Sequence, residues 1–226
     1  MIHYNLENKG FLLSGKNYSY AMFVNRTGFL QHLYYGKKTE ERDLDYLIKS
    51  HGAAAEPDPE DINMDMTTDY MPSECGSFGR GDFRPATVIV RRDDGAAMSR
   101  FKYLSHKIVR GALKLNGMPC ARKADETLTV TLKDDFSATE IDLNYSVSED
   151  SDILVRNAVI RNAGNERADI LKAFSFCTEL PDTCGSYRAM RLAGSWAAER
   201  KPIVTPLAEV TFRIESTRGY SSHNRN

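Results

Sequence analysis

The single tryptophan of the chain has a setting that suits contact with a ligand. Trp196 follows two small residues, Gly194 and Ser195, so its indole ring can be exposed and approachable. An exposed indole can pack on the C–H face of a sugar ring while its N–H donates to a hydroxyl group. The alternative is that this tryptophan belongs to the core, where large aromatic side chains usually lie.

Asp82 and Arg84 form a second candidate site, within the glycine-containing stretch 79–85. Residues two apart point to the same side of an extended backbone, so this pair would present a carboxylate and a guanidinium together. Both groups can hydrogen-bond polyol hydroxyls. The alternative is a local ion pair that fixes the end of a loop.

Paired acids occur at Asp134–Asp135 and again at Glu149, Asp150 and Asp152. Glycosidases use two carboxylates on opposite sides of the scissile bond. Adjacent acids in tight turns are more often solvated turn formers, and we interpret both groups in that way. The five histidines are scattered along the chain. We therefore expect neither a catalytic constellation nor a metal or cofactor site.

Composition narrows the range of partners. A formal net charge of -1 argues against nucleic acid as a partner. No apolar stretch is long enough to span a bilayer, and residues 1–10 do not resemble a signal peptide. We expect a cytoplasmic protein whose thiols are reduced and packed as small hydrophobic groups. The four cysteines are Cys75, Cys120, Cys177 and Cys184.

The elements that must position these residues are strands. In residues 126–132 and 138–147 apolar and polar side chains alternate, which is typical of a strand with one buried face. Residues 152–160 and 168–176 carry apolar side chains on both faces, as in a sheet that is covered on both sides. Short turns separate these four runs, so they predict an antiparallel meander.

Further strands are expected on both sides of this meander, and Asp94–Gly95 predicts a hairpin between two of them. Residues 42–48 favour one or two helical turns. Residues 50–81 form a long loop rich in proline, glycine and acids, which is the first place to look for a site. Together these elements predict one all-β domain over residues 1–226. The further strands are expected at 2–6, 11–14, 18–24, 29–35, 86–91, 101–109, 187–192 and 209–214.

Five motifs occur in a fixed order, at 34–37, 81–85, 110–119, 194–200 and 215–223. Together they resemble the N-terminal domain of bacterial α-galactosidases of glycoside hydrolase family 36. The resemblance implies a large antiparallel β-supersandwich of the galactose-mutarotase-like type. It also implies a catalytic (β/α)₈ barrel downstream, which is absent from this chain, and a small C-terminal β domain.

Members of this family are retaining enzymes that release terminal α-galactose from melibiose, raffinose and similar sugars. The resemblance places the catalytic aspartates in the barrel, so this chain alone should be inactive. It implies that the N-terminal domain contributes to the substrate pocket and to an oligomer, commonly a tetramer. Trp196 matches the family's substrate-binding tryptophan. Asp82 and Arg84 match a family motif, and substrate binding by these two residues is our inference from their chemistry.

The partners implied are α-galactosides, the protein's own barrel and sister subunits. Apolar surface that the barrel would cover should be exposed in this chain. A different hypothesis is a stand-alone carbohydrate-binding or scaffolding β-sandwich without an enzyme attached, which would bind sugar by itself.

Overall fold

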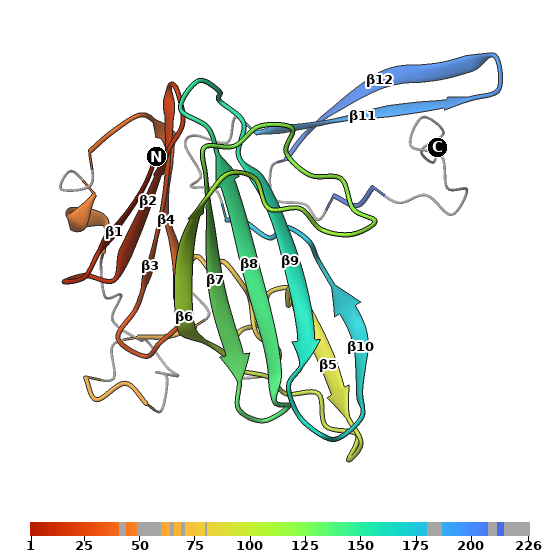
Figure 1. The fold of residues 1–226 in the computed structure, drawn as a ribbon. Helices are drawn as coiled ribbons and strands as arrows, with labels where there is room; N and C mark the ends of the chain where they lie inside the picture. Colours follow the sequence, from red (N-terminus) through yellow and green to blue (C-terminus); the bar gives the residue numbers. More distant parts are fainter. Residues whose placement is uncertain are drawn as a thin grey trace. The chain divides into compact units, whose positions relative to one another are not determined.

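The computed structural model describes residues 1–40, 44–48, 60–63, 66–68, 71–79, 81–179, 187–207 and 212–214. These residues form antiparallel strands and one short 3-10 turn, Asp45–Leu47, which confirms the all-β class and a helical turn within 42–48 (Figure 1). The chain divides into two compact units, Met1–Glu179 and Leu180–Asn226. That residues 1–226 form a single domain stays a prediction.

The strands predicted near the N-terminus form an antiparallel meander with the order β1-β2-β3-β4. Gly28 has a φ of +91° in the turn between β3 and β4, where glycine avoids the strain that a side chain would cause. The Asn25 carboxamide oxygen accepts hydrogen bonds from the backbone N–H groups of Thr27 and Phe29, which closes this turn. The strands are β1 (Ile2–Asn5), β2 (Gly10–Ser14), β3 (Tyr18–Val24) and β4 (Leu30–Lys37).

A second four-stranded sheet has the order β6-β7-β8-β9 and contains three runs of the predicted central meander. Its strands are β6 (Phe101–Arg110), β7 (Glu126–Asp134), β8 (Thr139–Val147) and β9 (Val155–Asn162). The fourth run forms β10 (Ala168–Ala173), but this strand pairs with β5 (Val88–Arg92) instead of β9. The prediction of a continuous four-strand meander was therefore wrong at its last strand.

The Asp94–Gly95 turn forms, but it does not produce the predicted hairpin. Gly95 has a φ of +83°, and its N–H donates to the Arg92 carbonyl at 3.0 Å. The strands before and after this turn belong to different sheets, because β5 pairs with β10 and β6 pairs with β7. Residues 96–100 lead from one sheet to the other, and the Ser99 N–H donates to the Phe78 carbonyl on the way.

The hydrophobic core of the first unit draws on both four-stranded sheets and on β5. The alternating residues of β7 and β8 face inward as predicted, and Leu128, Leu132, Ile141 and Tyr145 are completely buried. Residues from β2 and β3, including Leu13 and Met22, complete the same cluster. The period of two in the sequence therefore identifies the core face of these strands correctly.

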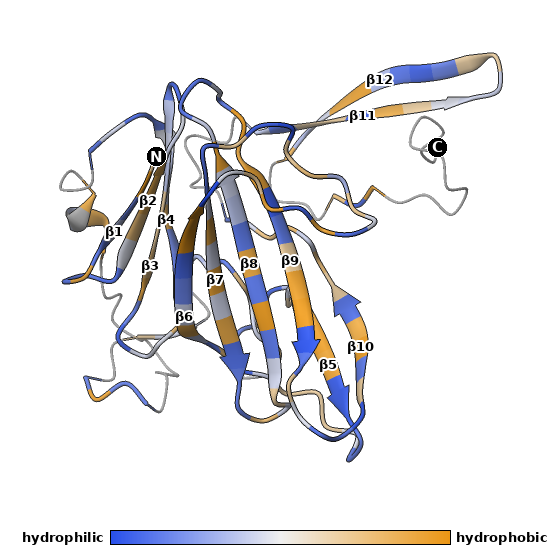
Figure 2. Cartoon of the chain, in the orientation of Figure 1, coloured by the Kyte–Doolittle hydropathy of each residue, from blue (hydrophilic) through white to orange (hydrophobic). Residues whose placement is uncertain are grey.

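Burial on both faces, as predicted for the last two runs, does not occur among the described residues. Figure 2 shows apolar residues along β9 and β10. The large apolar side chains of this region are substantially exposed, with fractions between 43% and 66%. They belong to Ile153, Ile170, Leu171, Phe174 and Phe176.

The second unit contains a hairpin of β11 (Arg188–Ser195) and β12 (Ala198–Pro206). The sequence predicts β11 but not β12, because Pro202 and Pro206 argue against a strand that needs its N–H groups. Both prolines are tolerated because β12 pairs with one neighbour only. A strand over 209–214 was predicted, but 212–214 are not in a strand, and 209–211 lie outside the described residues. Among the described segments, no helix has the length and apolar character needed to cross a membrane.

Candidate functional site

Trp196 lies at the tip of the β11–β12 hairpin. Ser195 pairs with Ala198, so Trp196 and Ala197 form a two-residue turn. Ala197 has a φ of +61°, and its N–H donates to the Glu199 carboxylate at 3.0 Å. The indole is 90% exposed, so in this chain Trp196 is not a core residue and its faces are open to a ligand.

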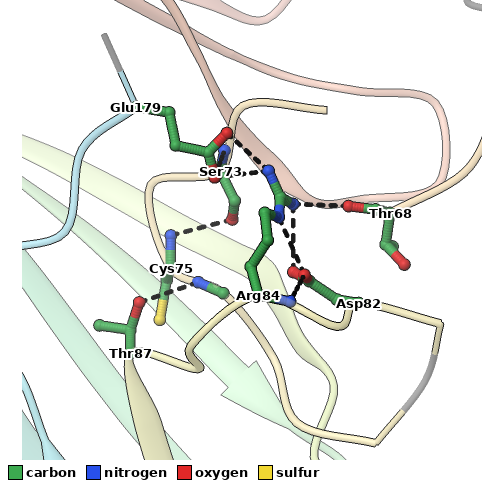
Figure 3. Close-up of polar contacts among 8 residues, drawn as sticks. Thr68, Ser73, Cys75, Asp82, Arg84, Thr87 and Glu179 are labelled. Atoms are coloured by element: carbon green, nitrogen blue, oxygen red, sulfur yellow. Dashed lines mark hydrogen bonds and ion pairs between the residues drawn. The ribbon is translucent and has the colours of Figure 1, made fainter. Parts of the chain in front are cut away.

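Asp82 and Arg84 lie together in the first unit, as the sequence predicts, but they bind each other (Figure 3). The Arg84 Nε and Nη2 atoms donate to the two Asp82 carboxylate oxygens at 2.9 and 3.1 Å. The Arg84 backbone N–H also donates to Asp82 Oδ1 at 3.1 Å. This is the geometry of the local ion pair that the sequence left as the alternative. A sugar contact by either residue stays a prediction.

The Arg84 guanidinium has further partners on its other edge. Its Nη1 atom donates to both Glu179 carboxylate oxygens at 2.5 Å, and Nη2 donates to the Thr68 carbonyl at 2.6 Å. The Ser73 N–H donates to the same Glu179 carboxylate at 3.4 Å. Burial raises the pKa of Glu179, and the Arg84 charge acts against that shift. Arg84 thus joins the 81–87 segment to Glu179, the last residue of the first unit.

Parts of the long loop 50–81 are packed into the first unit. The Asp61 carboxylate is buried and accepts two hydrogen bonds from Arg26, at 2.6 and 2.7 Å. Residues 72–74 run along the edge of β4, where the Glu74 N–H donates to the Leu30 carbonyl at 3.1 Å. A pocket beside Asp82 is lined by polar and apolar side chains of β4 and this loop, including Gln31, Ser73, Ser77, Phe29 and Met71.

Glu74 is a functional candidate that the sequence did not reveal. Its carboxylate is fully buried and accepts hydrogen bonds from the Tyr20 and Tyr145 hydroxyls at 2.5 and 2.6 Å. His32 Nδ1 lies 3.0 Å from the same carboxylate. Burial alone would raise the pKa of Glu74, but the His32 hydrogen bond and the nearby Arg156 charge outweigh it and lower the pKa. Burial and the Glu74 charge raise the pKa values of both tyrosines.

Arg156 completes this group of buried polar side chains. Its parity along β9 matches that of Ala158 and Ile160, which pack against the core. A charged residue on the apolar face of a strand requires a buried partner. The position of Arg156 in the alternating pattern could therefore have indicated a buried charge from the sequence. The Arg156 Nη2 atom lies 3.7 Å from the Glu74 carboxylate.

The acidic turns are structural, as predicted, but their environments differ. Asp134 is completely buried instead of solvated, because its carboxylate accepts hydrogen bonds from the backbone N–H groups of Arg100 and Ser137. Glu149 and Asp150 are exposed, as the sequence predicts for turn residues.

The thiols also differ from one another. Cys75 is buried as predicted, and burial raises the pKa of its thiol to about 12. Cys120 is exposed, so the expectation that every cysteine packs as a small hydrophobic group was wrong there. Cys184 lies outside the described residues. No group of three metal-ligating side chains occurs in the part of the chain that the structure describes.

The first unit has antiparallel sheets around one core, which define a β-sandwich, and the second unit carries an exposed tryptophan that can contact a ligand. Residues 28–226 match the family model of the glycosyl hydrolase family 36 N-terminal domain. The chain belongs to this family, which confirms the resemblance of its five motifs.

Curated relatives include the bifunctional α-galactosidase/sucrose kinase AgaSK of Mediterraneibacter gnavus, 33% identical over all of this chain and 24% of that protein. The α-galactosidase AgaA of Geobacillus stearothermophilus is 30% identical, again over the whole chain and over 31% of its own length. The chain therefore spans 24% of the length of the first relative and 31% of the length of the second.

Solved structures agree with this assignment. The family 36 α-galactosidase AgaB of Geobacillus stearothermophilus has a TM-score of 0.85 at 31% identity, over all of this chain and 31% of its own. A variant of AgaA, solved in complex with raffinose, has a TM-score of 0.84 at 30% identity and covers 96% of this chain and 31% of its own.

Proposed function

We propose that this chain is the non-catalytic N-terminal part of a retaining α-galactosidase that hydrolyses terminal α-galactose from melibiose- and raffinose-type sugars. Two curated relatives are named α-galactosidases, and AgaA variants have been solved in complex with raffinose and stachyose. These relatives are about three to four times longer than this chain, which supports a longer polypeptide that carries the catalytic residues in a (β/α)₈ barrel.

In this proposal the chain lends Trp196 to the substrate pocket. The observation that carries it is the 90% exposure of an indole at the tip of a two-residue turn. An indole left in water has no packing role within this chain, whereas it forms an apolar wall once a sugar ring lies against it. The same domain would dock on the barrel and on sister subunits of an oligomer, and the long loop 50–81 would contribute to those contacts.

The test is Trp196→Ala in the longer polypeptide, with a synthetic α-galactoside as substrate. We expect kcat/KM to fall by roughly five- to thirtyfold, equivalent to about 1–2 kcal/mol of transition-state binding. Trp196→Phe keeps an aromatic wall and should recover part of the loss. Unchanged kcat/KM in the alanine variant would contradict the role of Trp196.

Asp82 and Arg84 are also proposed as substrate-binding residues, although their contacts in the chain support the ion-pair alternative as well. We also propose a cytoplasmic location. The rival function, a stand-alone carbohydrate-binding or scaffolding β-sandwich, predicts that the chain alone binds raffinose measurably. Titration calorimetry of the 226-residue chain with raffinose distinguishes the two, because our proposal does not require such binding.

A further inference from the structure

The buried charges of the first unit form hydrogen bonds between several of its elements. Glu74 comes from the loop beside β4, and its carboxylate accepts from Tyr20 on β3 and Tyr145 on β8. It therefore bonds to both four-stranded sheets at once. Its side chain has no exposed surface, so these hydrogen bonds lie in an environment of low dielectric constant, where an ionised group must have partners.

Arg156 extends these contacts to the segment that follows β10. Its guanidinium lies 5.3 Å from the ring centres of both Tyr145 and Phe176. The Nη2 atom donates to the Glu74 carbonyl at 2.6 Å, and Nη1 donates to the Cys177 carbonyl at 3.0 Å. One planar guanidinium thus bonds to the backbones of two irregular segments, a geometry that the ammonium group of lysine does not reproduce.

A buried ion pair of this kind needs a reason beyond stability. Apolar residues of similar volume often stabilise a core as well as a buried pair does, because charges lose their hydration on burial. The Glu74 segment is already held by backbone hydrogen bonds to β4, whereas the Cys177 carbonyl that accepts from Arg156 lies in an irregular segment after β10.

We propose that Arg156, oriented by Glu74, is a positioning residue that fixes the course of residues 176–179. These are the last residues of the first unit before the segment that carries the β11–β12 hairpin and Trp196. The positioning deepens the proposed function and rests on it, because residues 176–179 precede the hairpin that carries Trp196 along the chain. Arg84 assists from the other side through its bonds to Glu179.

The first experiment measures hydrogen exchange of the 226-residue chain as wild type and as Arg156→Lys. The lysine variant keeps the charge beside Glu74 but loses the paired carbonyl contacts. We expect exchange within 174–179 to become about tenfold faster or more, as for the loss of a charge-assisted hydrogen bond, while exchange in β7 and β8 stays unchanged. The matched control is Arg161→Lys, on the same strand, whose partners are the surface acids Asp142 and Glu140.

Equal acceleration throughout the first unit, or none at 174–179, would overturn the proposal in favour of a purely stabilising pair. If the lysine variant does not fold, Glu74→Gln serves instead. It keeps the size of the side chain and removes the charge that orients Arg156. Exchange at 174–179 should then accelerate more than exchange in β7 and β8, which follows only the global loss of stability.

The second experiment is a double-mutant cycle of Arg156→Lys and Trp196→Ala in the longer polypeptide. We expect Arg156→Lys to lower kcat/KM in the wild type but to have little further effect when Trp196 is absent. Equal losses in both backgrounds would show that Arg156 does not act through Trp196. If Trp196→Ala alone changes nothing, the proposed function fails, and the exchange experiment still decides whether Arg156 positions 176–179.

Discussion

At the scale of single residues, this domain buries charged side chains in its interior. Glu74 is the clearest case, because a carboxylate in the core is stable only while its donors are in place. The hydroxyls of Tyr20 and Tyr145 and the His32 ring supply those donors. The free energy of unfolding should therefore depend on the charge of this one side chain.

Acid should weaken the domain through Glu74. The pKa of Glu74 is lowered from its ordinary value of 4.5 in the folded chain, so the unfolded chain takes up this proton first as the pH falls. The stability that Glu74 contributes is complete above that value and is lost as the pH falls through the folded pKa. We expect Glu74→Gln to lower the free energy of unfolding by about 1–3 kcal/mol at neutral pH.

The difference in the free energy of unfolding between Glu74→Gln and wild type should shrink as the pH is lowered below about 4, because glutamine has no proton to take up. Urea unfolding of both proteins at several pH values measures this difference. A gap that stays constant across the acid range would mean that the carboxylate does not titrate with folding.

Separate measurements of stability and of substrate affinity decide whether Arg84 has a structural role or binds the sugar. Because its guanidinium bonds to Asp82, Glu179 and the Thr68 carbonyl, we expect Arg84→Gln to lower the free energy of unfolding by about 1–3 kcal/mol. Arg91→Gln is the matched control, since Arg91 forms a more exposed pair with Asp169 that should contribute about 1 kcal/mol or less. A raised KM without any loss of stability would instead assign Arg84 to the sugar.

At the scale of elements, the sequence predicts most strands because their apolar residues alternate. Leu128 and Leu132 on β7, and Ile141 on β8, face the core as their spacing predicts. The pairing of β10 with β5 was not predictable in this way, because both faces of the fourth run are apolar and do not select a neighbour. The same limit applies to Glu74, which sits in an irregular segment without any period.

The two-residue turn at Trp196 was missed for a related reason. A hairpin is recognised in a sequence from strands on both sides of a turn. The prolines of β12 argue against a strand, so the second strand was not predicted. The small neighbours of Trp196 indicated exposure as one of two alternatives, whereas its place at a hairpin tip required the pairing of Ser195 with Ala198.

Gly194 should be essential to the shape of this hairpin. It has a φ of +152°, and a Cβ atom there would lie 2.5 Å from the Ala198 carbonyl oxygen and 2.8 Å from the Glu199 Cα atom. Both contacts are with backbone, so the turn itself must move. We expect Gly194→Ala to accelerate hydrogen exchange in 188–206 and to lower kcat/KM of the longer polypeptide in the same direction as Trp196→Ala.

The control for this substitution is Gly95→Ala. Gly95 also has a positive φ, of +83°, but no atom lies within 4 Å of its added Cβ. Gly95→Ala should lower the free energy of unfolding by about 1 kcal/mol without affecting the hairpin. Native-like exchange in 188–206 of the Gly194 variant would show that the turn tolerates a side chain.

At the scale of the whole molecule, the apolar residues near β9 and β10 are the feature that a self-sufficient domain would not show. Ile153, Ile170 and Leu171 are each more than half exposed, and Phe174 and Phe176 follow on the same stretch of chain. Both faces of the run were predicted to be covered, and these side chains stay exposed among the residues that the structure describes. Exposed apolar side chains near a strand edge favour association.

We therefore expect the isolated 226-residue chain to self-associate through this surface, because water is released when two such patches meet. Sedimentation velocity over a range of concentrations should show a growing fraction of larger species, and Leu171→Glu should reduce it by introducing a charge into the contact. Leu104→Glu is the matched control, since Leu104 on β6 is 51% exposed and Leu171 is 53% exposed.

In the longer polypeptide of the proposed function, the barrel would cover these apolar side chains. Leu171→Glu should then weaken the docking of the two parts and lower the thermal midpoint. A strictly monomeric wild-type chain, or equal effects of both substitutions, would place the docking surface elsewhere.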